Sequence, residues 1–293
     1  MQKNSLIHYL HLHFLVFIAG FTAIFGELIT NSSESIVWHR MAIASILAFF
    51  VLILRKNSLI ISFSKFKKYS FQGLIIALHW ITFFEAIKQS NISITLAMFS
   101  TAAFFTSILE PIFYKRNIKF SEIFLGFSVI VGIFLIFNSE IKYLSGIFLG
   151  IISALLASFF SVFNGILVKD DNALRISFYE FFTGVIFITL FLFLRNDIKS
   201  LLIQNIFTLN YLYIFVLGSI CTAYAFIASV YLLKYISPFS MVLTYNLEPV
   251  YGIILAVCIF GSNEIMTFEF YIGFFLILSS ILINMYFKRN NYK

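Results

Sequence analysis

The sequence predicts an all-α integral membrane protein, in which ten transmembrane helices form two five-helix repeats of inverted topology around a central cavity. Three observations support this prediction: the composition, the spacing of ten apolar runs, and similar motifs that recur in both halves. The 293 residues are 61% hydrophobic and only 11% charged, with a mean hydropathy of +0.97. A soluble domain has about 25% charged residues. The chain therefore has too few charges to cover a soluble core, and the same numbers exclude disordered, collagen-like and coiled-coil proteins.

Ten apolar runs are separated by short polar breaks, and a helical span needs roughly 20 such residues. The expected spans are residues 8–28, 35–54, 70–87, 92–114, 121–138, 145–168, 175–194, 210–233, 238–260 and 268–287. Each must be helical because lipid offers backbone groups no hydrogen-bond partner, and the alternating pattern of barrel strands is absent. Residues 1–26 are interpreted as the first span rather than a signal peptide, because no small-x-small cleavage site follows.

The distribution of Lys and Arg predicts the orientation. Of the 20 such residues, fifteen fall in loops on the side of the N-terminus, four fall on the other side, and Arg40 lies within the second span. Cytoplasmic loops have the excess of positive charge, so we expect both termini in the cytoplasm and the protein in the plasma (inner) membrane. The same rule explains the net charge of +7 without a nucleic-acid partner. Cys221 and Cys258 lie in apolar runs and are interpreted as packing residues.

Similar motifs at matching positions divide the chain into two halves. The fifth span begins Glu122-x-x-x-Gly126, and the tenth begins Glu269-x-x-x-Gly273. The expected repeats are residues 1–141 and 142–293. Because each repeat has an odd number of spans, the second repeat crosses the membrane in the opposite sense. Inverted repeats are characteristic of secondary transporters, in which two related halves exchange conformations around a central site.

Ionisable side chains within a span are rare and often functional, because each is costly in hydrocarbon. Glu248 lies about ten residues into the ninth span, near the bilayer midplane, with Asn246 before it and Pro249 after it. Proline breaks a helix locally, and broken helices at the midplane hold transporter binding sites. We expect Asn246 and Glu248 to bind substrate, Pro249 to shape the break, and Glu248 to exchange protons. The alternative is a protonated structural acid bonded to a neighbouring helix.

Aromatic and imidazole side chains are further candidates for substrate contacts. His79 lies in the middle of the third span and could donate to a substrate carboxylate, while Trp80 beside it could form an apolar or cation–π wall. The alternative is a neutral His79 in an interhelical hydrogen bond, with Trp80 as packing. Tyr224 and Tyr245 offer hydroxyls near the same depth, although most Tyr residues in such chains lie at the interface or pack.

Three further charged residues are expected to act in structure or gating. Arg40 lies about five residues inside the outer face, and Glu180 lies about five residues inside the inner face at the matching position of the second half. A rise of about 1.5 Å per residue puts them roughly 15 Å apart, so a direct ion pair is not expected. Arg40 would pair instead with Glu27 or Glu85, or snorkel to the interface. Glu110, at the end of the fourth span, is expected to form a helix-end ion pair and could act as a gate.

Several stretches resemble EamA-type members of the drug/metabolite transporter superfamily. They are residues 37–41, 79–87, 109–112, 237–239 and 247–252, which read VWHRM, HWITFFEAI, LEPI, SPF and LEPVYG. The resemblance covers the whole chain and implies a ten-helix carrier with a central cavity that moves small metabolites, often amino acids, outward. EamA-type halves usually have an acid just after spans 4 and 9. The second half has Glu264 there, whereas residues 115–118 of the first half are Lys-Arg-Asn-Ile, which leaves a symmetric role for this acid open.

The sequence lacks the H-E-x-x-H, G-x-S-x-G, P-loop and C-x-x-C patterns of common catalytic sites. We therefore expect a secondary transporter that exports amino acids or related small polar or amphipathic metabolites by alternating access, with no catalytic residue, metal or cofactor. Without an ATP-binding motif a gradient must drive it, through proton antiport or facilitated efflux. The alternatives are a channel-like or structural membrane subunit and, with less support, an intramembrane enzyme. The expected partners are the small-molecule substrate and the lipid bilayer.

Overall fold

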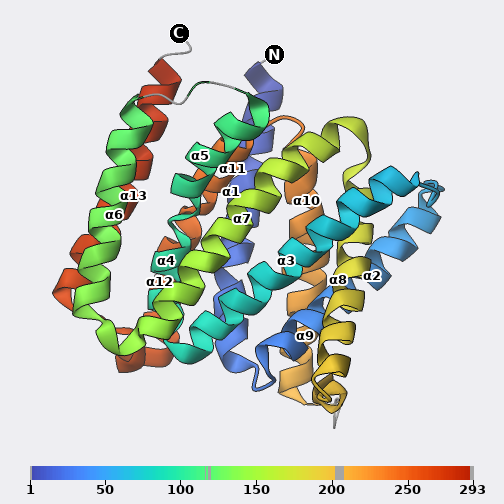
Figure 1. The fold of residues 1–293 in the computed structure, drawn as a ribbon, viewed down its shortest axis with the longest axis horizontal. Helices are drawn as coiled ribbons and strands as arrows, with labels where there is room; N and C mark the ends of the chain where they lie inside the picture. Colours follow the sequence, from blue (N-terminus) through green and yellow to red (C-terminus); the bar gives the residue numbers. More distant parts are fainter. Residues whose placement is uncertain (1, 116, 118–119, 202–207, 291–293) are drawn as a thin grey trace.

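The computed structural model describes residues 2–115, 117, 120–201 and 208–290, and every regular element in this part of the chain is helical (Figure 1). The α-helices are α1 (Gln2–Leu28), α2 (Ser33–Leu54), α3 (Phe63–Gln89), α4 (Ile92–Phe99), α5 (Ala102–Tyr114), α6 (Phe120–Ser139), α7 (Leu144–Asp170), α8 (Ala173–Leu194), α9 (Leu209–Gly218), α10 (Ala225–Leu232), α11 (Pro238–Tyr245), α12 (Leu247–Phe260) and α13 (Phe268–Asn290). The shorter elements are the 3-10 helices η1 (Ile141–Tyr143), η2 (Ile198–Leu201) and η4 (Gly261–Glu264) and the π-helical segment η3 (Ser219–Tyr224).

Each predicted span corresponds to one helix or to consecutive helices along one path. Within the residues that the structure describes, eight stretches are long and apolar enough to cross a membrane. The fifth and tenth spans correspond to α6 and α13, whose described parts include the apolar stretches Phe127–Ser139 and Phe268–Ser280. Spans 4, 8 and 9 are each divided, into α4 and α5, into α9, η3 and α10, and into α11 and α12. The predicted all-α architecture of ten spans is thereby confirmed.

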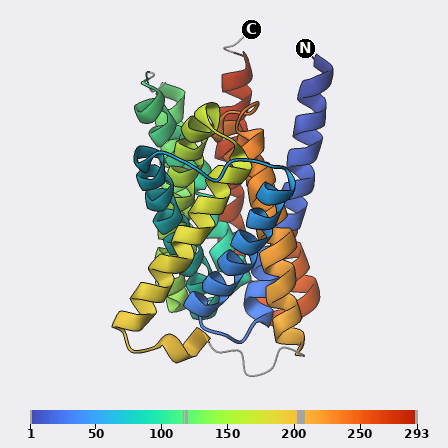
Figure 2. The ribbon, with the colours of Figure 1, turned by 90° about the vertical axis from the view of Figure 1, so that its right-hand side faces the viewer.

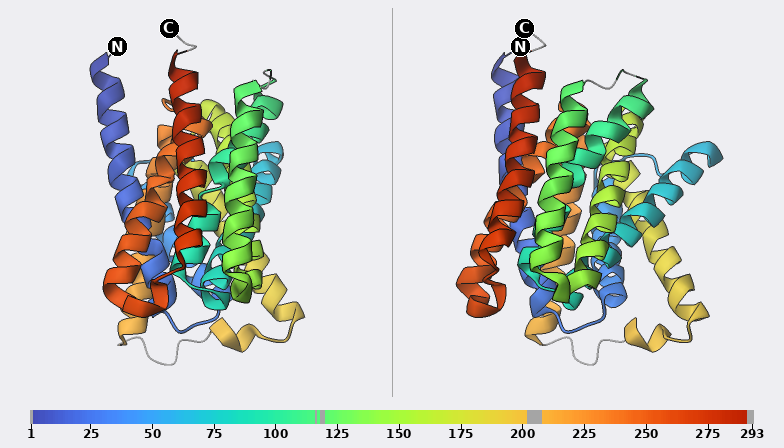
Figure 3. Two further views of the ribbon diagram at one scale, coloured as in Figure 1. Left: turned by 90° about the vertical axis from the view of Figure 1, so that its left-hand side faces the viewer. Right: turned by 60° about the vertical axis from the view of Figure 1, so that its left-hand side comes forward.

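Helices that belong to corresponding spans of the two halves pack directly against each other. These pairs are α2 with α8, α4 with α12, α5 with α11, and α6 with α13. Figures 2 and 3 show the long helices packed in one bundle, in which α6 and α13 form an outer pair and α3 and α8 are inclined to the other helices. Both chain ends lie at the same end of the bundle, as an even number of crossings requires (Figure 1). The central space of the bundle therefore lies between the halves.

Spans 4 and 9 are interrupted at matching points. Each begins with an eight-residue helix, α4 or α11, whose N-terminus is capped by the side chain of Asn91 or Ser237. The interruptions follow at Ser100 and Asn246, each nine residues after its cap. Discontinuous helices at corresponding positions of two halves mark the place where a binding site is expected in a membrane protein.

The break in span 9 lies slightly earlier than the sequence indicates. It falls at Asn246, and Pro249 lies in the first turn of α12, where its missing N–H has no helical acceptor in any case. Glu248 lies in the same turn. Pro111, in contrast, lies inside α5 without interrupting it. A proline is therefore a guide to the region of the break but does not determine its residue.

Two acids cap helices that belong to the opposite half. Glu264, which follows α12, accepts hydrogen bonds from the backbone N–H groups of Ile92 (3.1 Å) and Ser93 (2.8 Å) at the start of α4. Glu110, near the end of α5, accepts a hydrogen bond from the backbone N–H of Phe239 (3.2 Å) at the start of α11. Glu110 therefore provides the capping carboxylate of the first half, which residues 115–118, directly after span 4, cannot provide because none of them is acidic. An acid at a helix N-terminus is also favoured by the helix dipole.

A cluster of charges joins the start of α3 to the α7–α8 connection. The buried carboxylate of Asp171 accepts hydrogen bonds of 2.7 Å from Lys65 Nζ, Tyr69 Oη and Arg175 Nε. Burial alone would raise the pKa of Asp171, but the hydrogen bonds from these three side chains lower it from 3.8 to about 2. Arg175 also donates to the carbonyl oxygen of Ser58 (3.1 Å), which extends the cluster to the α2–α3 connection.

Two glycines allow α6 and α13 to approach closely. A Cβ atom placed on Gly132 would lie 2.7 Å from the carbonyl oxygen of Gly273, and one placed on Gly273 would lie 2.7 Å from the carbonyl oxygen of Gly132. Any side chain at either position would push the two backbones apart, because neither contact is with a flexible atom.

We expect Gly132→Ala to reduce the free energy of unfolding by about 1–3 kcal/mol, the usual cost of overpacking. Thermal or denaturant unfolding of the detergent-purified protein would measure it. The control is Ile130→Ala on the same helix, where the wild-type side chain is 53% exposed and faces away from the bundle. Equal stability of the two variants would contradict the close approach of α6 and α13.

Asp171→Asn should lower the melting temperature at pH 7, because Lys65 and Arg175 lose their shared partner. A carboxyl whose pKa is lowered by folding contributes its full stabilisation above the unfolded value of 3.8, and this contribution is lost as the pH falls towards the folded value of about 2. The difference between wild type and variant should therefore be constant above about pH 5 and shrink at lower pH. Asp197→Asn, at an exposed residue, is the control. A difference that grows on acidification would refute this account.

Candidate functional site

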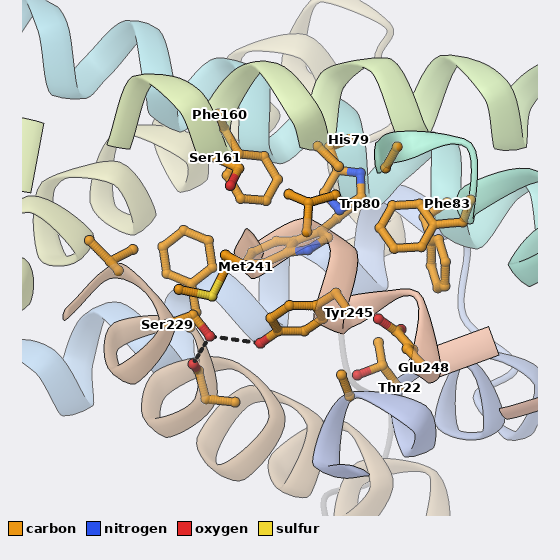
Figure 4. A pocket seen from close by; sticks show the side chains of 18 of the residues that line it. Thr22, His79, Trp80, Phe83, Phe160, Ser161, Ser229, Met241, Tyr245 and Glu248 are labelled. Carbon is orange, nitrogen blue, oxygen red and sulfur yellow. Dashed lines mark hydrogen bonds between the residues drawn. The ribbon is translucent and has the colours of Figure 1, made fainter. Parts of the chain in front are cut away.

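A cavity of about 140 Å³ lies between the halves, next to the break in span 9 (Figure 4). An engineered cavity of about 150 Å³ is known to hold a benzene molecule, so a space of this size admits one small compound. Much of the wall is aromatic and is formed by Trp80, Phe83, Phe99, Phe160 and Phe226. The polar part of the wall includes Arg40, His79, Asn164, Ser229, Tyr245, Asn246 and Glu248.

Five of the six residues predicted to contact substrate line this cavity, namely His79, Trp80, Tyr245, Asn246 and Glu248. Figure 4 shows the side chains of His79, Trp80, Tyr245 and Glu248 arranged around it. Tyr224 is the exception. It is 45% exposed and lines a separate groove, where its hydroxyl forms a 2.9 Å hydrogen bond with Nε2 of His11.

The break in span 9 determines the position of the Glu248 side chain. Glu248 lies in the first turn of α12, where the helix dipole favours a negative charge, and its side chain is only 5% exposed. Arg40 acts on Glu248 electrostatically, and no hydrogen bond to the Glu248 carboxyl is found within the described ranges. The carboxyl is therefore both buried and available to a ligand.

Arg40 occupies a position that the sequence analysis did not anticipate. The predicted ion pair with Glu27 or Glu85 is wrong, because no ion pair in the described part of the chain joins Arg40 to either acid. Glu85 accepts hydrogen bonds from Ser33 and Gln89 instead. Arg40 reaches the cavity, where its guanidinium carbon lies 3.8 Å from the centre of the Trp80 ring. This distance gives a cation–π contact.

Thr222 determines how Arg40 is held. Its hydroxyl accepts a 2.9 Å hydrogen bond from Arg40 Nε and donates a 2.7 Å bond to the carbonyl oxygen of Leu217, five residues earlier. This spacing belongs to the π-helical turn of η3, an element that is frequent at functional sites. Nη1 of Arg40 is left buried without a hydrogen-bond partner in the described part of the chain. No sequence signal marks Thr222, because a π turn has no recognisable residue pattern.

His79 and Tyr245 are held by hydrogen bonds within the protein. Nδ1 of His79 lies 3.0 Å from the carbonyl oxygen and 2.9 Å from the hydroxyl of Ser153 on α7. His79 therefore forms the interhelical hydrogen bond that was the alternative to a substrate contact. Its ring also lines the cavity. The hydroxyl of Tyr245 lies 2.7 Å from that of Ser229, which donates to the Ala225 carbonyl oxygen. Tyr245 is therefore the donor in this pair.

Glu180 and Glu110, which are predicted to act in structure or gating, are not among the residues that line the cavity. Glu180 is fully buried, and Nδ2 of Asn164 donates to it over 3.4 Å. No ion pair joins Glu180 to Arg40 within the residues described, in agreement with their expected separation. Asn164 lines the cavity as well, so it connects Glu180 to the cavity wall.

The unpartnered groups define what the cavity can bind. Nη1 of Arg40 and Nδ2 of Asn246 are buried donors without a protein acceptor in the described residues. They can hold a carboxylate or another oxygen acceptor, because an unsatisfied buried donor is costly. Glu248 can hold an ammonium group. The aromatic wall can cover an apolar substituent.

Comparison with known proteins agrees with this arrangement of two halves. The EamA-like transporter family matches the chain twice, over residues 7–138 and 144–286. One protein of known crystal structure aligns with a TM-score of 0.67 over 94% of this chain and 95% of its own, at 13% identity, which shows the fold alone. No curated protein matches the sequence. Because the two family matches together span nearly the whole sequence and coincide with the two sets of five spans, the chain belongs to the EamA-like transporter family.

Proposed function

We propose that the protein is a secondary transporter that exports amino acids or related small amphipathic metabolites from the cell. The single observation that supports this proposal best is the central cavity, in which an unpartnered donor pair and a carboxyl face one small volume. A compound with both an ammonium and a carboxylate group would satisfy both sets of partners. The aromatic wall favours compounds that also have an apolar side chain.

Alternating access requires that the cavity open to each side in turn. In the proposed cycle, the contacts of Glu264 with α4 close one side, and those of Glu110 with α11 close the other. Both contacts join the two halves, so a relative movement of the halves would break one and preserve the other. The odd number of spans in each half supports an inverted relation between them and hence this exchange of conformations.

Glu248 is the proposed site of proton coupling. As a neutral acid it can donate one hydrogen bond, and as an anion it can pair with a substrate ammonium group near Arg40. Exchange between these two forms during the cycle would link the movement of substrate to that of protons.

Glu248→Gln retains the shape and hydrogen bonding of the side chain but cannot titrate. We expect the variant to fold and to bind substrate in part, but to lose the pH dependence of amino-acid transport in reconstituted vesicles between about pH 5.5 and 8. Glu269→Gln, at an exposed acid in the first turn of α13, is the matched control. Wild-type rates across this pH range in Glu248→Gln would eliminate Glu248 as the coupling residue.

Arg40→Met removes the buried donor while retaining an apolar side chain over Trp80. Because a hydrogen bond to a charged group is worth about 1.5–3 kcal/mol, amino-acid affinity should fall by roughly 10- to 100-fold. The melting temperature should fall little, since the variant also removes a buried charge. Isothermal titration and thermal unfolding would measure the two effects, with Arg195→Met at a largely exposed arginine as the control. Unchanged affinity together with a large loss of stability would make Arg40 a structural residue.

A further inference from the structure

We propose that four polar side chains between α3, α7 and α8 form a binding site for a sodium ion beside the central cavity. The four residues are Gln72, Asn164, Ser177 and Glu180, and the side chains of all four are fully buried. A role of this ion in coupling rests on the proposed function, whereas the binding of the ion does not.

Contacts among three helices bring the four residues together. Nδ2 of Asn164 on α7 donates to Glu180 on α8 over 3.4 Å. Nε2 of Gln72 on α3 donates to the carbonyl oxygen of Phe160 over 3.4 Å, and Phe160 is one helical turn from Asn164 on α7. Ser177 lies three residues before Glu180 and so shares its face of α8. α3 packs extensively against both α7 and α8, which brings the side chains of the three helices to one place.

The unpartnered atoms in this cluster are all oxygens. They are Gln72 Oε1, Asn164 Oδ1, Ser177 Oγ and Glu180 Oε1, each buried without a hydrogen-bond partner in the described ranges. In the central cavity, in contrast, the unpartnered atoms include two nitrogen donors, Arg40 Nη1 and Asn246 Nδ2. Buried acceptors that lack donors are costly, and hard cations are bound through carboxylate, amide and hydroxyl oxygens.

The charge of the cluster indicates a monovalent ion. Glu180 is its one carboxyl group, and no cation lies within ion-pair distance of it in the residues described. An unpaired carboxylate in a membrane protein interior is highly unfavourable. One monovalent cation balances this charge, whereas a divalent ion would leave an excess positive charge.

A proton on Glu180 would also neutralise the carboxylate, but it supplies only one hydrogen-bond donor. That donor can satisfy one neighbouring acceptor, and the Ser177 hydroxyl, which is the other possible donor of the cluster, forms no hydrogen bond to either amide oxygen in the described residues. A sodium ion can contact several oxygens at once, and transporters place such ions near the substrate site. The observations therefore favour Na⁺ over a proton.

Asn164 connects the ion site to the cavity, since its side chain belongs to the cluster and also lines the cavity wall. An ion that draws the amide oxygen of Asn164 towards Glu180 would fix this part of the wall. Occupancy of the two sites would then be coupled, and the coupling would act equally in both directions.

Thermal unfolding of the full-length protein in detergent tests the binding of the ion directly. The melting temperature should rise with NaCl and reach a plateau, whereas choline chloride at the same ionic strength should not produce this rise, because a ligand of the folded state stabilises it. Glu180→Gln should abolish the rise. Gln72→Leu should shift its midpoint to at least threefold higher NaCl, and the control Gln89→Leu, at an exposed residue of the same helix, should not change it.

Three results would overturn the proposal: an equal rise in choline chloride, a full sodium response in Glu180→Gln, or a melting temperature that depends on pH but not on sodium, which would indicate a proton. If Glu180→Gln does not fold, the wild-type titration together with Gln72→Leu and Gln89→Leu decides the question. Failure of the proposed function is distinguishable, because it would appear as absent amino-acid transport in vesicles made from protein that retains the sodium response.

Discussion

The need to satisfy every backbone polar group inside a bilayer governs this structure. Lipid provides no hydrogen-bond partners, so an interrupted helix is tolerated only where protein groups or a polar cavity receive the freed N–H and carbonyl groups. The break in span 4 meets this condition, because the hydroxyls of Ser100 and Thr101 donate to the carbonyl oxygens of Ala97 and Met98. The Glu248 carboxyl lies in the cavity because the second break is there.

The polar interior is divided into two regions of different chemistry. The central cavity has unpartnered nitrogen donors beside the Glu248 carboxyl, whereas the unpartnered atoms of the cluster around Glu180 are all oxygens. Asn164 belongs to both regions. An anionic group of a ligand fits the first region, and a cation fits the second. The positions of charged residues in the sequence do not reveal this difference, because Arg40 and Glu180 are two isolated charged residues there.

The sequence predicted the ten spans well because hydropathy determines which segments enter lipid, and helix is the only structure open to most of them. It also placed Glu248 and Asn246 correctly next to a break. It could not place Arg40, since the contact with Thr222 depends on a π turn that leaves no pattern in the residues. Tyr224 was assigned to the cavity by its depth, but depth does not determine which face of a helix a side chain occupies. The cap provided by Glu110 does not follow from the family pattern, because that pattern has the acid after span 4 and Glu110 lies within it.

The two helix caps that join the halves, Glu264 on α4 and Glu110 on α11, also affect the order in which the protein can fold during its synthesis. When the first five spans have left the ribosome, the N–H groups of Ile92 and Ser93 have no Glu264 to bind, because that residue has not yet been synthesised. The N-terminus of α11 is in the opposite position, since Glu110 is already in the membrane when Phe239 arrives. The N-terminus of α4 therefore lacks its cap while only the first half is in the membrane. The cap can form only after the residues that follow the ninth span have been synthesised.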